Sequence, residues 1–329
     1  MRKLVQAVVL GLAVVGGAGG PASAATLAEN NEAMFAQMQK VRGVSSAQIA
    51  RIRKIFQASG RLGQGNPAVT RHPMTPQQAA ARVPGDPYAY YRNARFERIC
   101  GARYMAPLYD PATERPEDAK VCIDMFEYPN MPMAYPVTWV RASEAAQICA
   151  AEGKRIGDAH EWEGAAAGAL LPPDYRFDLG TPQAMRAAHN AKWGQHKTWT
   201  YGPQWKRGIC AQNSSKTPGC NGGSWTGCGS NTYPSGAFPN CKSALGAYDL
   251  EGNAAEHMNL PLAPDQMASR GSTKLGVTEM KGSWFIWDKV RAHEEWARWR
   301  APFWHGTRVL SPSSHSNYHL GFRCFKDVR

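Results

Sequence analysis

Two acidic residues flank a short turn in the C-terminal half of the chain, and their chemistry suits a metal ion. Asp249 and Glu256 enclose a Gly252-Asn253 turn whose backbone carbonyls can point inward. Hard cations such as calcium bind this mixture of carboxylate and backbone oxygens. The pattern therefore predicts a calcium site. The alternative is a hydrogen-bonded turn in which both carboxylates accept backbone N–H groups.

Further metal-ligand types follow this turn along the chain. Two histidines and one carboxylate can hold non-haem iron in an open facial triad. Only His315 and His319 have the i, i+4 spacing of a helix, and they lie in a stretch predicted as loop. Two interpretations of these residues stay open: they are ligands of an iron centre, or they are ordinary loop residues. The residues are His293, Glu294, Glu295, His305, His315 and His319.

Tryptophans and arginines alternate in the same region. Such residues dominate binding hot spots, which favours a groove for an extended peptide, a sugar or a siderophore-like ligand. The same aromatic side chains can instead fill a core that lacks regular elements. The candidate cleft residues are Ser283, Trp284, Trp287, Arg291, Arg300 and His305.

The N-terminus and the cysteines indicate export. Arg2 and Lys3 precede an apolar stretch too short to span a bilayer, and a small-residue site predicts cleavage after Ala24. Eight cysteines in an exported chain indicate disulfides. Cys100 and Cys122 are candidates for a local bridge. The remaining central cysteines allow three pairings, or a four-cysteine zinc site, among Cys210, Cys220, Cys228 and Cys241.

We therefore expect a periplasmic or secreted protein without a transmembrane segment. The formal charge of +12 comes from scattered basic residues, so we expect no nucleic-acid partner. Calcium is the expected cofactor. The expected partner is an unidentified ligand or protein of the cell envelope.

Four units follow one another along the chain: a signal peptide over 1–24, a helical arm over 25–59, a linker over 60–95 and a large domain over 96–329. Ser45 with Gln48 predicts a capped helix in the arm. In the domain, periodicity predicts strands over 121–128 and 135–140 and a helix over 143–150. Asp158 with Glu161 predicts the start of a second helix, and residues 172–245 are predicted as mostly loop. His72, alone in the linker, is expected to be solvated.

Four segments of the domain carry a family resemblance in the order in which they occur. They are YPVTWV with AAQICAAEGKR (135–155), HEWE (160–163), GAYDLEGNAAE (246–256), and KGSW with the closing GFRC (281–284 and 321–324). Together they resemble the formylglycine-generating enzymes, or sulfatase-modifying factors. The resemblance implies an α+β fold, a loop-rich variant of the C-type lectin fold, here preceded by the helical arm.

The resemblance also implies site residues. It places the side chains of Asp249 and Glu256 and the carbonyls of Gly252 and Ala254 on calcium. It pairs Cys149 with Cys324 in a disulfide. The family's aromatic pair around the glutamate is replaced by Ala255 and His257.

The family's catalytic pair of copper-binding cysteines is missing. Alignment from Gly282 places Ile286 and Arg291 at these positions, and alignment back from Cys324 places Glu295 and Arg300 there. Thiolate ligation of copper is impossible from this segment, so we expect neither a copper site nor formylglycine generation. The catalytic residues stay unknown. The first hypothesis is a cell-envelope binding or accessory module. The alternatives are a periplasmic oxidoreductase resembling the pyoverdine-maturation branch, with or without a metal, and a lectin-like carbohydrate binder.

Overall fold

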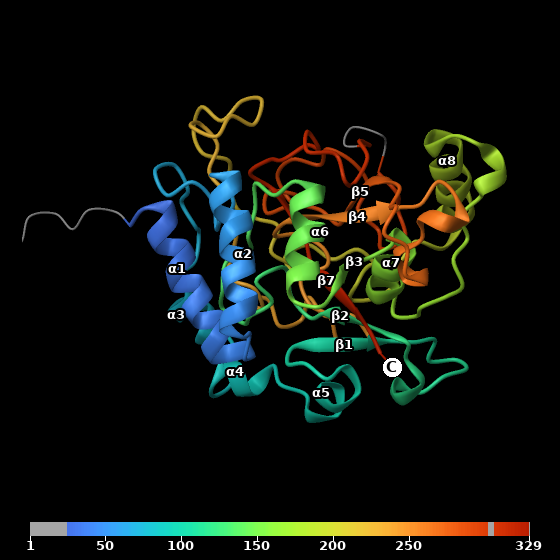
Figure 1. The fold of residues 1–329 in the computed structure, drawn as a ribbon, viewed down its shortest axis with the longest axis horizontal. Coiled ribbons are helices and arrows are strands. Elements are labelled where there is room, and N and C mark those ends of the chain that lie inside the picture. Colours follow the sequence, from blue (N-terminus) through green and yellow to red (C-terminus); the bar gives the residue numbers. More distant parts are fainter. Residues whose placement is uncertain (1–24, 302–305, 329) are drawn as a thin grey trace, which may run out of the picture.

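The N-terminal helices lie at one end of the molecule and the helix Pro182–Trp193 lies at the other, while the two small sheets and the remaining helices lie between them (Figure 1). The computed structural model describes residues 25–301 and 306–328, so the predicted signal peptide and His305 lie outside the described residues. None of the helices in this part is long and apolar enough to cross a membrane. The helices are α1 Leu27–Gln37, η1 Met38–Arg42 (π-helical), α2 Ser46–Ser59, α3 Pro76–Ala80, α4 Pro87–Tyr90, α5 Ala94–Cys100, α6 Ala142–Ala151, α7 Ala159–Ala167 and α8 Pro182–Trp193, with short 3-10 turns η2 Pro116–Asp118, η3 Phe177–Leu179, η4 Gly194–His196, η5 Pro264–Gln266 and η6 Ala268–Arg270.

Short strands build two sheets. The first has the order β1-β2-β7-β3 with antiparallel neighbours, and the second has the order β5-β4-β6, in which β4 and β6 are parallel. Long irregular segments connect them, which confirms the predicted loop-rich α+β class. The strands are β1 Met105–Leu108, β2 Val121–Asp124, β3 Arg155–Ile156, β4 Ala255–Leu260, β5 Val277–Lys281, β6 Leu320–Gly321 and β7 Cys324–Asp327.

The N-terminal arm is a helical hairpin with defined ends. In α1, Thr26 and Glu29 form a capping box, and in α2 the predicted box of Ser45 and Gln48 is present, with the Ser45 N–H donating to Gln48 at 2.9 Å. Gly43 ends the first helical segment at φ 75°. This left-handed conformation suits glycine because it has no Cβ.

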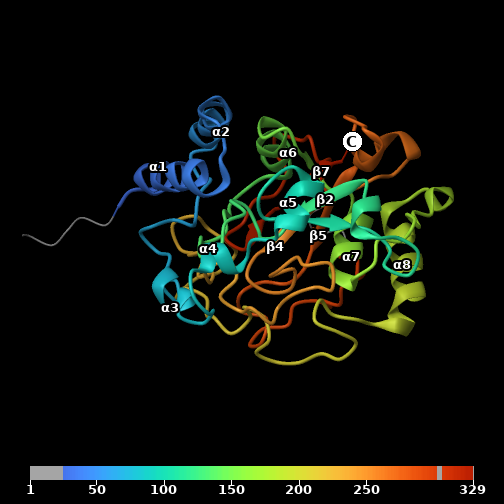
Figure 2. The ribbon, with the colours of Figure 1, turned by 90° about the horizontal axis from the view of Figure 1, so that it is seen from below.

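The arm packs on the domain rather than projecting from it. Helix α2 lies beside α6 in both views (Figures 1 and 2). Met38, Ile52 and Phe56 of the arm share one buried apolar cluster with Val140 and Ile148 of the domain. The hydrophobic effect therefore holds the arm against the domain.

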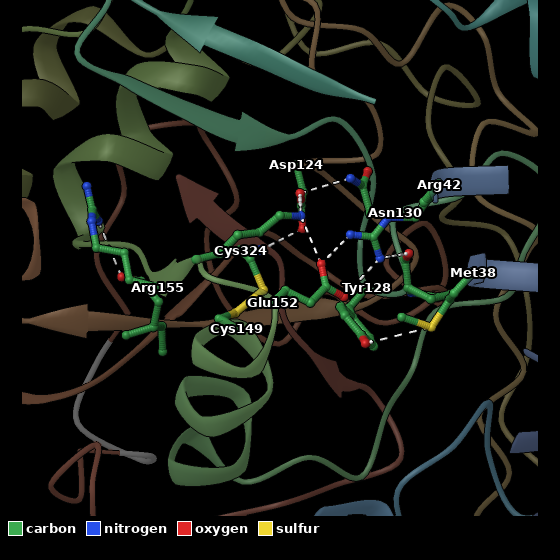
Figure 3. The surroundings of a disulfide bond; sticks show 12 residues. Met38, Arg42, Asp124, Tyr128, Asn130, Cys149, Glu152, Arg155 and Cys324 are labelled. Atoms are coloured by element: carbon green, nitrogen blue, oxygen red, sulfur yellow. Dashed lines mark hydrogen bonds and ion pairs between the residues drawn. A yellow bond between two sulfur atoms is a disulfide. The ribbon is translucent and has the colours of Figure 1, made fainter. Parts of the chain in front are cut away.

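A chain of buried charges reinforces this contact (Figure 3). Arg42 of the arm pairs bidentately with Glu152 and also donates to the Pro129 carbonyl at 2.8 Å. Glu152 lies 3.2 Å from Lys154, and Lys154 lies 2.6 Å from Asp124. Burial alone would raise the pKa of Glu152, but Arg42 and Lys154 outweigh it and hold the pKa at about 2.

Residues 60–95 do not form the extended linker that composition predicts. Helices α3 and α4 interrupt this segment, and Gly63 pairs with Thr138 as an isolated β-bridge. His72 is not solvated: its ring stacks on Tyr135 with centroids 3.5 Å apart, and its Nδ1 lies 2.9 Å from the Thr232 carbonyl. Burial lowers the pKa of His72 to about 4, so the ring is neutral.

Two other local predictions need correction. Residues 135–140 form no strand, because Trp139 adopts φ 58° and Val137 donates its N–H to the Tyr128 carbonyl, nine residues earlier, instead of to a neighbouring strand. The strand predicted over 121–128 ends at Asp124, and residues 172–245 contain helix α8, capped by Thr181. The helices predicted at 143–150 and after Asp158 are confirmed as α6 and α7.

All eight cysteines are paired. Cys149–Cys324 joins α6 to β7 across 175 residues, as the resemblance implies, and Cys100–Cys122 forms the predicted local bridge. The central four pair as Cys210–Cys241 and Cys220–Cys228, so they form disulfides and not a zinc site. Closing a loop as long as that of Cys149–Cys324 stabilises the fold by about 5 kcal/mol in the loop-entropy model.

The arm offers a test of the buried ion pair. Replacing Arg42 with Met leaves Glu152 buried without its main partner, so we expect the free energy of unfolding to fall by about 3 kcal/mol. Urea denaturation followed by circular dichroism measures this change. Arg53→Met is the matched control, because Arg53 and Glu32 form an exposed pair on the same hairpin, with 36% and 52% of their side chains exposed. The control should cost less than about 1 kcal/mol; equal losses in both variants would contradict the anchoring role of Arg42.

Candidate ligand-binding pocket

A small pocket of about 170 Å³ opens in the region where the resemblance places the catalytic cysteines. Two segments far apart in the sequence form it, one before Cys210 and one after β5. Its lining is aromatic and charged: Trp199, Trp205, Trp287, Arg291, His293, Glu294 and Glu295.

Backbone hydrogen bonds position these two segments. Trp199 and Gly202 exchange hydrogen bonds of 2.8 and 3.0 Å in a tight hairpin. Ala297 donates its N–H to the Thr198 carbonyl at 2.8 Å, and Lys197 pairs with Glu294 at 2.9 Å. The hairpin therefore lies against residues 294–297 and completes the pocket wall.

Glu295 is the buried carboxylate of the pocket, with 5% of the residue exposed. It accepts hydrogen bonds from the Ser283 hydroxyl at 2.6 Å, from the Trp205 indole at 2.9 Å and from the Gln212 amide. Burial raises its pKa to about 7, although these three donors favour the ionised form. Glu295 is thus held in one orientation by three different side chains.

Ser283 supports Glu295 and is not a nucleophile. Its hydroxyl donates to Glu295 and accepts hydrogen bonds of 2.9 Å from Gln212 and from the Gly252 N–H. Both oxygen lone pairs are therefore used, and the residue is fully buried. No lone pair is left to attack a substrate.

A second carboxyl, Glu251, lies behind Glu295. It accepts a hydrogen bond of 2.8 Å from the Thr200 N–H, while its other oxygen has no hydrogen-bond partner within the described residues. Burial, together with the nearby Glu295, holds the pKa of Glu251 well above its ordinary value. The ionised form of Glu251 is therefore disfavoured, whereas three hydrogen-bond donors stabilise the ionised form of Glu295.

Aromatic rings form the walls. The Arg291 guanidinium lies over the Trp205 ring, 4.1 Å from its centroid. The His293 ring stacks on Trp299 at 4.9 Å and lies 4.6 Å from the ring of Trp287. Only a small open space is left between these rings.

The structure divides the six candidate cleft residues. Trp287 and Arg291 line the pocket, and Ser283 lies beneath it. Trp284 belongs to another cluster, where it contacts Tyr318 and His319 and where Lys216 lies over its ring. His305 lies outside the described residues.

Arg300 is an internal ion-pair partner rather than a cleft residue. It is fully buried and binds Glu163 at 2.9 Å and Asp174 at 3.3 Å, while Lys281 lies 3.1 Å from the same Glu163. Several kcal/mol of desolvation would destabilise an unpaired charge here, so the network explains why arginine is tolerated in the core. The sequence pattern could not separate this arginine from Arg291.

Trp199 and Trp205 are pocket residues that the sequence did not reveal. They lie in the predicted loop region, and only long-range contacts bring them to Glu295. The one available signal was the density of tryptophans in that loop.

The possible iron ligands do not converge. His293 lines the pocket, whereas His319 lies 4.5 Å from the ring of Trp284, and His315 is adjacent to Asn317. Across residues 25–301 and 306–328, no group of three or more His, Cys, Asp or Glu side chains is arranged to hold a metal ion.

The predicted calcium turn is also organised differently. Glu256 turns both carboxylate oxygens to Arg323, at 2.6 to 2.9 Å, and one of them also accepts the Trp162 indole N–H at 2.7 Å. Asp249 accepts the Gly236 N–H at 2.6 Å and keeps its Oδ1 without a hydrogen bond in the described part. As arranged, Glu256 is not free to bind a cation, so these residues do not fit the predicted calcium site.

A third carboxyl, missed at the sequence level, completes this centre. Glu127 accepts hydrogen bonds from the Ala254 N–H at 3.0 Å and from Asn253 at 3.2 Å. Burial and the nearby Asp249 and Glu256 hold its pKa well above the ordinary value. Burial likewise raises the pKa of Asp249 to about 7, so the ionised forms of Glu127 and Asp249 are disfavoured, while Glu256 is paired with Arg323.

Comparison with known proteins matches this architecture to one family. The model of the sulfatase-modifying factor enzyme 1-like domain matches residues 93–328. The structure of PvdO from Pseudomonas aeruginosa is similar over 68% of this chain and 91% of that chain, with 16% identity and a TM-score of 0.35. The crystal structure of CarF is similar over 69% of this chain and 98% of that chain, with 12% identity and a TM-score of 0.38. No curated protein matches the chain significantly.

The family match covers both sheets, all four disulfides and the pocket; of the described residues, it leaves outside only the N-terminal arm and the segment after it. The chain belongs to the family of sulfatase-modifying factor enzyme 1-like domains.

Proposed function

We propose that this chain is an exported binding module of its family that does not generate formylglycine. The observation that carries the proposal is the state of its sulfur atoms: all eight cysteines are in disulfides. The family's chemistry needs thiolates to hold copper, and a disulfide sulfur cannot serve as that ligand. Glu295 and the pocket tryptophans occupy the region instead.

The pocket has the composition of a ligand site. Binding sites combine apolar and aromatic walls with a few fixed polar groups. Here, three tryptophans supply the walls, and Glu295 is oriented by Ser283, Gln212 and Trp205. Preorganised groups of this kind lose little entropy when a ligand binds.

Export is part of the same proposal. The predicted signal peptide and the four disulfides support it, because disulfides persist in oxidising compartments such as the bacterial periplasm. A periplasmic or extracellular ligand is therefore the natural target of the pocket.

One observation favours a second candidate function, acid–base catalysis in the pocket. A general acid or base works best with a pKa near the operating pH, and burial raises the pKa of Glu295 to about 7. The three donors that fix Glu295, however, use both of its oxygens, which makes it better suited to orientation than to proton transfer.

Calcium binding stays a prediction, and the proposed function does not depend on it. The buried charges at the predicted turn are balanced without a cation if Arg323 pairs with Glu256 and if Asp249 and Glu127 take up protons. The high pKa of both carboxyls supports this arrangement.

The absence of formylglycine generation can be tested directly. We expect the purified chain, incubated with copper, oxygen and a cysteine-containing peptide, to leave the peptide thiol unchanged, because no thiolate is available to bind the metal. Mass spectrometry of the peptide measures the result. A family member that carries both cysteines serves as the positive control. Conversion of the peptide cysteine to an aldehyde by this chain would overturn the proposal.

Asp249→Asn tests how the carboxyl centre is neutralised. The folded-state pKa of Asp249 is raised above its unfolded value, so its contribution to stability is present at low pH and is lost as the pH rises through about 7. The amide cannot ionise, and we expect the free energy of unfolding of the variant to be higher by on the order of 4 kcal/mol at pH 8, with less than about 1 kcal/mol of difference at pH 4, near the unfolded pKa. Denaturation at both pH values, in EDTA, measures this.

The control for this experiment is Asp178→Asn, since Asp178 is exposed and should show no such gain. The same melts with added calcium examine the calcium prediction. A calcium-dependent stabilisation of the wild-type chain that disappears in Asp249→Asn would show that a cation, rather than protons, neutralises this centre.

A further inference from the structure

The pocket already holds a cation that belongs to the protein. Arg291 is largely exposed, yet its guanidinium lies over the Trp205 ring at 4.1 Å. Among the described residues, no carboxylate oxygen lies within the 4.0 Å of an ion pair from Arg291. The guanidinium of Arg291 therefore rests on the aromatic face of Trp205, and such exposed cation–π contacts are weak enough to be exchanged.

The other walls suit a cation equally well. Trp199, Trp287 and His293 present further rings around the same space, and Glu295 adds a carboxylate. Cages of several aromatic rings with an acidic group bind ammonium and guanidinium groups through the ring quadrupoles. The pocket has this composition.

The local charges indicate room for one cation. Glu294 is paired with Lys197 at 2.9 Å, and burial together with the nearby Glu295 raises the pKa of Glu251 and disfavours its charge. Glu295 is left with Arg291 as its nearby positive group. If an external cation replaces Arg291 over Trp205, the charge inside the pocket does not change.

The size of the space limits the ligand. A volume of about 170 Å³ is smaller than the cavities that enclose drug-sized molecules, so it suits a headgroup rather than a whole large ligand. From these observations we propose that the pocket binds a small organic cation, a methylated ammonium or a guanidinium group, in exchange for the side chain of Arg291. The inference deepens the proposed binding function and rests on it.

If the ligand exchanges with Arg291, removal of this side chain should strengthen binding. If Arg291 only lined the pocket, its removal would not strengthen binding. Removing Arg291 eliminates the internal competitor and one positive charge, so affinity for the cation should rise by about threefold, the equivalent of one exposed cation–π contact. Removing the Trp205 ring should lower the affinity by a similar factor or more.

Isothermal titration calorimetry with choline chloride tests the proposal on the full mature chain. The matched probe is 3,3-dimethylbutan-1-ol, a neutral molecule of nearly the same shape, and arginine amide is the guanidinium probe. The variants are Arg291→Ala and Trp205→Leu, with Trp225→Ala as a control, because Trp225 contacts Trp139 outside the pocket. Thermal melts confirm that each variant is folded.

We expect the wild-type chain to bind choline and arginine amide but not the neutral probe. Arg291→Ala should bind both cations more tightly than the wild-type chain does, and Trp205→Leu should bind them more weakly. Trp225→Ala should bind them with the wild-type affinity. Three results would overturn the inference. They are binding of the neutral probe as tight as that of choline, weaker cation binding by Arg291→Ala than by the wild-type chain, and no cation binding by either the wild-type chain or Arg291→Ala. These outcomes leave the proposed function standing, because that proposal falls only if the peptide cysteine is converted to an aldehyde.

Discussion

The guanidinium of Arg323 is the point at which the central segments of the domain meet. It pairs with Glu256 at the start of β4, and it donates to the carbonyls of Asp124 and Met125 at the end of β2 and to that of Tyr248, at 3.0 to 3.1 Å. In a fold with few regular elements, many backbone carbonyls lack partners in a sheet or helix. A buried arginine with five donors can satisfy several of them at once. These contacts join β2 of the first sheet to β4 of the second.

Buried charges organise the periphery in the same way. Glu163 gathers Arg300 and Lys281, and Glu279 binds Arg186 at 2.7 Å and the Ala301 N–H at 2.6 Å. These contacts fix residues 298–301, directly after the pocket residue Glu295. Ion pairs outside the pocket therefore help to position its wall. Arg300 belongs to these ion pairs, whereas Arg291 lines the pocket itself.

Local rules predicted the parts of the fold that local interactions form. The capping residues Ser45 and Asp158 marked the starts of α2 and α7, and the resemblance gave the Cys149–Cys324 bridge. Tertiary contacts decided the rest. The stretch 135–140 has the alternating apolar pattern of a strand, but Trp139 adopts a left-handed backbone conformation that a strand does not allow. Trp205 reaches Glu295 across 90 residues, and Arg323 takes the carboxylate that was expected to bind calcium. Neither contact leaves a periodic signal in the sequence.

The order of the strands bears on how the chain is made. Strand β7, residues 324–327, lies between β2 and β3 in its sheet, and Cys324 closes the longest disulfide. The sheet and the α6 bridge therefore cannot form until these late residues have been synthesised and brought to the others. A polypeptide with this topology cannot complete this sheet before its last strand is made. That delay suits the proposed export, since a translocation channel that accepts only extended chains would meet no closed domain.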